Sequence, residues 1–177
     1  MPPDPRTPVL GLAAYSGTGK TTLLRSLIPL LGQRGLRLGL IKHSHHAVEI
    51  DKPGKDSYRL RQAGATQMLV ASAYRIALMM AHEPGETPGL GEFLRRLDGH
   101  DLDLILVEGF KHSPIPKVEL HRPSLGHPLL CPDDPCILAV ATDGPLGSAV
   151  AVPILDLNAP RAIAEFIRAR CLDARRA

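Results

Sequence analysis

Apolar residues in this chain fall into short continuous runs and stretches with helical spacing. Runs that predict buried strands occupy residues 9–14, 36–42, 102–107, 136–141 and 154–155. Helices are predicted over residues 21–33, 57–63 and 90–97, and after Asn158, which we expect to cap the terminal helix. Because strands and helices alternate along the chain, the pattern predicts a three-layer α/β domain with a mainly parallel sheet.

Two further strand-like segments, residues 68–71 and 75–80, are separated by a short connection. This spacing predicts an antiparallel hairpin, which would make the sheet mixed. The stretch 114–135 is rich in proline and predicts irregular structure, apart from a short strand at residues 117–121. The sequence shows no internal repeat and no boundary, so we expect one domain over residues 1–177.

Residues 14–22, Ala-Tyr-Ser-Gly-Thr-Gly-Lys-Thr-Thr, lie between the first predicted strand and the first predicted helix. We call this segment the glycine-rich loop. It follows the phosphate-binding pattern Gly-x-x-x-x-Gly-Lys-Ser/Thr, with Ala14 in place of the first glycine. Small residues let backbone N–H groups surround a phosphate, and the helix that follows directs its positive end toward it.

This loop predicts the fold of P-loop NTPases and a triphosphate ligand with Mg²⁺. We expect Lys20 to contact the β- and γ-phosphates and to act in catalysis, and Thr21 to ligate the metal. The expected nucleotide-binding residues of the loop are Ser16, Gly17, Thr18, Gly19, Lys20, Thr21 and Thr22.

Two acidic residues follow predicted buried strands, where ligands gather in open α/β sheets. Glu108 is expected to hold Mg²⁺ beside Thr21 and to take part in catalysis. Asp143 is suited to accept two hydrogen bonds from guanine, which presents two donors on one edge. The usual guanine motif, Asn/Thr-Lys-x-Asp, lacks its lysine here, so a turn-forming aspartate before Gly144 is an equal alternative.

A polar segment after the second predicted strand carries three histidines, His43, His45 and His46. On an extended segment His43 and His45 would point to one side, which allows a metal pair. Hydrogen bonds to phosphate and contacts with a partner are the alternatives. The nearby lysines Lys42, Lys52 and Lys55 complete either a cationic rim for a partner or cofactor, or a solvated face.

The composition narrows the classes of partner. The 177-residue chain has a net charge of +3, no Trp, three Tyr and three Phe, which leaves few side chains to stack on bases. No apolar run is long enough to span a membrane. Three cysteines do not pair evenly, which favours reduced thiols. We therefore expect a cytoplasmic protein that binds neither nucleic acid nor membranes.

The sequence resembles the MobB family, molybdopterin-guanine dinucleotide biosynthesis adaptor protein B. The matching segments are residues 14–22, 39–46, 51–57, 104–111, 139–143 and 154–158. The resemblance implies a homodimeric GTP-binding protein with weak GTPase activity. Such a protein would assist the guanylyltransferase that attaches GMP to the molybdenum cofactor, and so would meet a molybdopterin-type cofactor.

Two other classes stay open at this point. A P-loop small-molecule kinase would share the glycine-rich loop and Glu108, and would carry arginines on a lid. A GTP-dependent metallochaperone would bind its metal through His43, His45 and His46.

Overall fold

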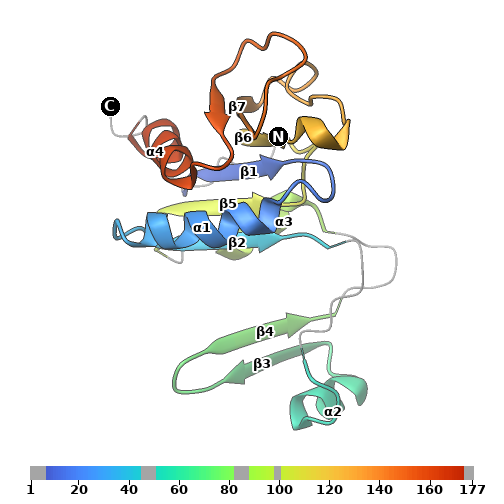
Figure 1. The fold of residues 1–177 in the computed structure, drawn as a ribbon. Helices are drawn as coiled ribbons and strands as arrows, with labels where there is room; N and C mark the ends of the chain where they lie inside the picture. The colour runs from blue at the N-terminus through green and yellow to red at the C-terminus, as the bar shows by residue number, and fades with distance from the viewer. Residues whose placement is uncertain (1–6, 45–50, 82–87, 98–100, 174–177) are drawn as a thin grey trace. The chain divides into compact units, whose positions relative to one another are not determined.

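The computed structural model describes residues 7–44, 51–81, 88–97 and 101–173 (Figure 1). The chain divides into two compact units, one made of residues 1–43 and 89–177 and the other of residues 44–88. The single domain expected over residues 1–177 did not anticipate this division. The second unit is an insertion between two elements of the first, and prolines and glycines gather in the sequence where it ends, at Pro84, Gly85, Pro88 and Gly89.

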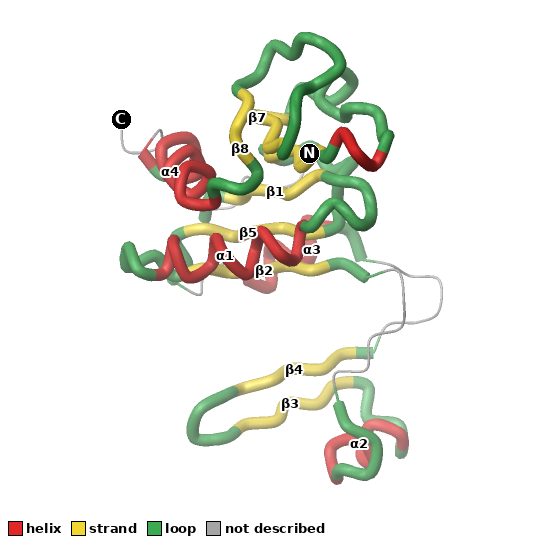
Figure 2. The backbone as a smooth tube through the Cα atoms, viewed as in Figure 1, coloured by secondary structure: helices red, strands yellow, loops and turns green. Residues whose placement is uncertain are grey.

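The first unit is built on a six-stranded sheet with the order β2-β5-β1-β6-β7-β8, and every strand pair in it is parallel. Figure 2 shows these strands in yellow. The strands are β1 (Val9–Ala13), β2 (Leu38–Lys42), β5 (Leu104–Glu108), β6 (Lys117–His121), β7 (Ile137–Thr142) and β8 (Ile154–Asp156). The helices are α1 (Lys20–Gly32), α3 (Leu90–Leu97), the 3-10 helix η1 (Pro123–Leu125) and α4 (Pro160–Cys171).

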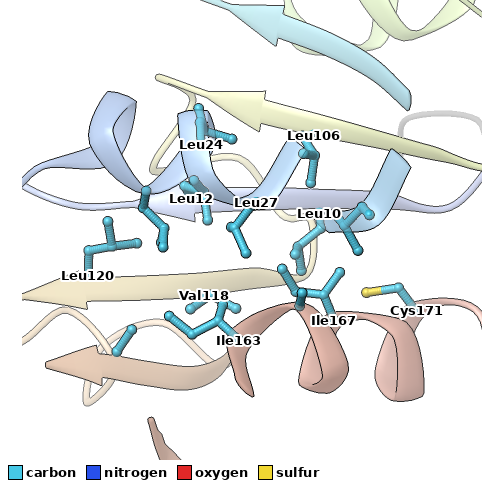
Figure 3. Close-up of a cluster of buried hydrophobic side chains, with 14 of the residues drawn as sticks. Leu10, Leu12, Leu24, Leu27, Leu106, Val118, Leu120, Ile163, Ile167 and Cys171 are labelled. Carbon is cyan, nitrogen blue, oxygen red and sulfur yellow. The ribbon is translucent and has the colours of Figure 1, made fainter. Parts of the chain in front are cut away.

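Two apolar clusters pack on opposite faces of this sheet, which gives the three layers that the sequence predicted. On one face, Leu10 and Leu12 of β1 pack with α1 and α4, as Figure 3 shows. On the other face, Ile105 and Val107 of β5 pack against Leu94 of α3. Both clusters draw on alternate residues of the same strands, as expected for a sheet covered on both sides.

The second unit contains α2 (Asp56–Gln62), β3 (Gln67–Ala71) and β4 (Ile76–Met80). The antiparallel hairpin predicted here is confirmed. The mixed sheet is not: β3 and β4 form a two-stranded sheet of their own, so the main sheet is parallel throughout the part of the chain that the structure describes. The local pattern defined the turn between these strands but carried no information about which other strands they meet.

The terminal helix begins later than expected, and its cap is Ala159 rather than Asn158. Pro160 occupies the first turn, where its fixed φ and missing N–H are tolerated. The N–H of Asn158 instead donates to Asp156 Oδ1 at 2.8 Å, within a turn that precedes the helix. Among the described helices, none is long and apolar enough to cross a membrane.

Candidate functional site

Three sequence features expected to bind a nucleotide meet at one edge of the main sheet. The glycine-rich loop follows β1, Glu108 is the last residue of β5, and Asp143 comes directly after β7. Strand β1 pairs with β5 on one side and with β6 on the other, and β6 pairs with β7. The carboxyl ends of these parallel strands therefore line one edge, which is where ligands bind in open α/β sheets.

The backbone of the glycine-rich loop turns through left-handed conformations that favour glycine. Gly17 has a φ of 78° and Gly19 a φ of 103°. Between them, Thr18 is buried, and its hydroxyl donates a 2.9 Å hydrogen bond to the Tyr15 carbonyl. The loop is thus closed on itself, and α1 begins immediately after it at Lys20.

The Lys20 side chain folds back over the loop. Its Nζ donates to the carbonyl oxygens of Ala14 and Tyr15, at 3.2 and 3.0 Å. Burial lowers the pKa of the Lys20 ammonium below its ordinary value, and the Glu108 carboxylate nearby opposes that shift. Lys20 is therefore a partly desolvated cation that a bound anion would stabilise.

Glu108 collects two partners that the sequence placed in different segments. Its Oε1 accepts a 3.4 Å hydrogen bond from the Thr21 hydroxyl. Lys42 Nζ lies 3.2 Å from Oε1 and 3.1 Å from Oε2. Mg²⁺ prefers hard oxygen ligands and keeps several positions for water and phosphate, so the hydroxyl and the carboxylate together fit this ion. Lys42 supplies the positive charge beside the carboxylate, and its ammonium group would have to move away from Glu108 for a metal ion to bind there.

Glu108→Gln is expected to reduce the gain in GTP affinity that Mg²⁺ confers, by about tenfold, because the amide keeps the shape but loses the charge that attracts the ion. Titration of a fluorescent GTP analogue, with and without Mg²⁺, measures this gain. Glu92→Gln on α3 is the matched control, since that carboxylate pairs with Arg96 on the same helix. An unchanged Mg²⁺ effect in Glu108→Gln would remove Glu108 from the metal site.

Asp143 forms an ion pair with Arg122, the residue that follows β6. Arg122 also donates from Nε to the Thr18 carbonyl at 2.8 Å. Its guanidinium thus lies between the glycine-rich loop and the aspartate predicted to read guanine. Sequence reasoning missed Arg122, because it lies in the irregular stretch and its two partners are distant in the sequence.

The irregular stretch after β6 is fastened by two buried charged residues of that strand. Glu119 accepts hydrogen bonds from the backbone N–H groups of Leu130 and Cys131, both at 2.8 Å. Lys117 Nζ lies 2.9 Å from Asp134 Oδ2. Charged residues that alternate with apolar ones in a fully buried strand were the signal for these anchors. They hold the stretch as a defined structure although it has little regular secondary structure.

Glu119→Gln is expected to lower the free energy of unfolding by about 1–3 kcal/mol, because its amide replaces one of two acceptor oxygens with a donor that faces a backbone N–H. Urea unfolding measures the change. Glu165→Gln is the control, since Glu165 is an exposed partner of Arg34 and solvent weakens such surface ion pairs. Equal losses in the two variants would contradict the anchoring role of Glu119.

Aromatic and cationic groups gather around Tyr15 in the glycine-rich loop. The Tyr15 and His127 rings are stacked, with centroids 4.3 Å apart, and Lys111 Nζ lies 4.7 Å from the centre of the Tyr15 ring. His127 brings the anchored stretch against the loop.

Burial raises the pKa of the Cys131 thiol in the same stretch, and the adjacent Glu119 adds to this effect. The thiol is therefore protonated at neutral pH.

The expected rim of histidines and lysines is only partly brought together. Lys42 reaches Glu108, and the His43 ring lies 4.8 Å from that of Phe110. Gly109 has a φ of 118°, and a Cβ there would lie 2.7 Å from the His43 Cβ, so this turn requires glycine. Residues Lys52 and Lys55 are exposed in the second unit, and His45 and His46 lie outside the described residues. Within the described ranges, no three His, Cys, Asp or Glu side chains are grouped to hold a metal ion.

The parallel sheet, the glycine-rich loop between β1 and α1, and the acid that ends β5 define an α/β protein with the fold of P-loop NTPases. Residues 9–143 match the family model described as MobB, molybdopterin guanine dinucleotide synthesis protein B. The chain belongs to this family, and its place is in molybdopterin-guanine dinucleotide biosynthesis. The resemblance stated from the sequence segments is thereby confirmed.

Relatives cover nearly the whole chain. The molybdopterin-guanine dinucleotide biosynthesis adapter protein of Escherichia coli (strain K12) is 52% identical over 161 residues, which are 90% of this chain and 91% of that protein. The Haemophilus influenzae protein of the same description is 46% identical over 164 residues, 90% of this chain and 87% of that one. The crystal structure of a MobB homolog from Bacillus stearothermophilus has a TM-score of 0.67 at 25% identity, and the match covers 91% of this chain and 95% of that chain.

Proposed function

We propose that this chain is a GTP-binding adaptor that assists the guanylyltransferase attaching GMP to molybdopterin. It binds GTP with Mg²⁺, hydrolyses it slowly, and acts as a homodimer in the cytoplasm. The family supplies the adaptor role in molybdopterin-guanine dinucleotide biosynthesis. The nucleotide, the metal, the partner enzyme, the contact with a molybdopterin-type cofactor and the dimer are what the proposal adds.

The observation that carries the proposal is the meeting of three groups with complementary chemistry at one sheet edge. Lys20 and the loop backbone suit a triphosphate, Thr21 with Glu108 suits Mg²⁺, and Asp143 suits guanine. Arg122 contacts both the loop and Asp143, so the phosphate and base ends of the site belong to one connected arrangement.

The test is a set of titrations with GTP, GDP and ATP, each with and without Mg²⁺, followed by binding of the purified guanylyltransferase to the immobilised protein. We expect GTP to bind more tightly than ATP, Mg²⁺ to strengthen GTP binding, and the transferase to be retained. Hydrolysis should be slow, at roughly 10⁻⁴ to 10⁻² s⁻¹, as in related GTPases without an added arginine finger. Failure to bind GTP would overturn the nucleotide part of the proposal.

Two other classes make different predictions in the same experiments. A small-molecule kinase would turn over many times per second and prefer ATP with an acceptor. The arginines of α3 do not suggest its lid, since Arg96 pairs with Glu92 on its own helix. A metallochaperone would bind Ni²⁺ or Zn²⁺ stoichiometrically through the histidine segment. Family membership favours the adaptor over both.

The dimer draws support from the apolar surface of the second unit. A lone two-stranded hairpin is marginally stable in water. In the single chain, β3, β4 and the turn between them leave several large apolar side chains exposed, namely Leu69, Val70, Tyr74, Ile76 and Leu78. A second copy of the chain would cover such a surface and supply further strands. Sedimentation equilibrium is expected to give twice the chain mass, and a monomer at micromolar concentration would refute the dimer.

A further inference from the structure

We propose that Arg122 is a positioning residue for guanine, supplying from β6 the cation that the guanine motif before Asp143 lacks. The motif Asn/Thr-Lys-x-Asp carries a lysine two residues before its aspartate, and this chain has Ala141 there. Arg122, which follows the neighbouring strand β6, places its guanidinium against the Asp143 carboxylate instead. The inference rests on the proposed binding of GTP and assigns a new residue to that site.

Two contacts and one close approach define the position of this guanidinium. It forms an ion pair with Asp143, and its Nε donates to the Thr18 carbonyl at 2.8 Å. A Cβ built on Gly19 would lie 3.5 Å from the third nitrogen of the group. The fork of Arg122 therefore spans the gap between the glycine-rich loop and the turn that holds Asp143.

The backbone beside Arg122 also packs on that turn. A Cβ on Gly144 would lie 3.5 Å from the Pro123 ring, so the residues after the arginine and after the aspartate are neighbours. Further along, Glu119 binds the N–H groups of Leu130 and Cys131, which fixes the stretch that follows Arg122. Hydrogen bonds to β6 thus anchor the segment that follows the arginine, and the side chain itself is held by Asp143 and Thr18. A side chain fixed in this way loses little entropy when a ligand binds.

Arg122 does not have to leave Asp143 for guanine to bind. An ionised carboxylate offers about four lone-pair sites on its two oxygens, and the arginine uses one oxygen. The other sites remain for the two donors of guanine. The arginine fixes the rotation of the carboxylate, and the planar fork does this while it also holds the loop carbonyl. A lysine has only a point charge and cannot serve both partners in the same geometry.

The experiment compares GTP and ATP affinity by isothermal titration for wild type, Arg122→Gln, Arg122→Lys, Asp143→Asn and the pair Arg122→Gln/Asp143→Asn. We expect Arg122→Gln to lower the preference for GTP over ATP by about tenfold, with a much smaller change in ATP affinity. Arg122→Lys should restore only part of the preference. The double variant should lose little more than Asp143→Asn alone, since both changes act on one interaction.

Each outcome has one meaning. Arg161→Gln, an exposed arginine at the start of α4, is the matched control and should keep the wild-type preference. If GTP and ATP affinity fall equally in Arg122→Gln, or if the preference stays, the arginine supports only the loop and the inference is wrong. If Arg122→Lys kept the full wild-type preference for GTP, the idea that the guanidinium must contact both Asp143 and the Thr18 carbonyl would also be wrong. A wild-type protein without preference for GTP would instead refute the proposed function, and this inference with it.

Urea unfolding separates positioning from stability. Arg122→Lys keeps the charge and is expected to unfold within a small margin of the wild-type midpoint, so it remains a valid test if Arg122→Gln does not fold. A loss of GTP preference at an unchanged midpoint is the signature of positioning. A lowered midpoint with an unchanged preference would assign Arg122 a structural role and contradict the proposal.

Discussion

Lys20→Ala is expected to lower GTP affinity by one to two orders of magnitude. The ammonium is held over the glycine-rich loop by the carbonyls of Ala14 and Tyr15, partly removed from water. A phosphate in the loop would replace those neutral acceptors with a charged one. Such a charge-assisted bond contributes about 1.5–3 kcal/mol, which is the stated loss of affinity. Titration with a fluorescent GTP analogue measures it.

The same variant is expected to fold as well as wild type. A folded-state pKa below the unfolded one means that folding disfavours the protonated lysine, and this small cost disappears only as the pH rises toward the ordinary lysine pKa. At neutral pH the empty protein should therefore not lose stability when Lys20 is removed. Arg95→Ala, an exposed cation on α3, controls for the loss of charge. Equal GTP affinity in Lys20→Ala and wild type would exclude the loop as a phosphate site.

Asp143→Asn is expected to lower GTP affinity by about one to two orders of magnitude while ATP affinity changes little. A carboxylate can accept both donors of the guanine edge, whereas an amide accepts through its oxygen and presents a donor beside it. The substitution also removes the charge that pairs with Arg122, so the carboxamide is less firmly oriented. Isothermal titration of both nucleotides against both proteins gives the change in preference.

Xanthosine triphosphate provides the positive half of this test. Xanthine carries a carbonyl where guanine carries its amine, so the amide donor of the Asn variant gains an acceptor. The variant should therefore bind the xanthosine nucleotide better than wild type does. If Asp143→Asn keeps the wild-type order of affinities, Asp143 is a turn residue, and backbone groups must read the base.

Local patterns predicted most of the elements, and contacts between distant residues account for what they missed. The helix Leu90–Leu97 and the strand Lys117–His121 have the predicted bounds. The hairpin was predicted from its turn, but its separate sheet depends on packing that no local window contains. Helix α4 was given the wrong cap because Asn158 is a favourable cap residue, whereas Pro160 fixes where the helix starts.

The residues of the candidate site likewise fall into those that a local motif predicts and those that only the folded chain brings together. The glycine-rich loop and Glu108 follow from a motif and a strand end, and the structure brings Thr21 and Glu108 together as the motif requires. Arg122 does not follow from any motif. Its role depends on the neighbouring positions of β6 and β7, and strand order in a parallel sheet is a property of the whole chain.

The strand order also determines when the site can form during synthesis. Among the described strands, β1, which precedes the glycine-rich loop, pairs with β5 and β6 alone, and β2 pairs with β5 alone. The ribosome must therefore release the chain past residue 104 before any two strands of the main sheet can join, a wait of about 5–20 s at usual translation rates. Until then the hairpin of β3 and β4 is the one described strand pair with both members present. A nascent chain thus contains its glycine-rich loop early, but the sheet edge that brings this loop together with Glu108 and Asp143 forms only with the second half of the chain.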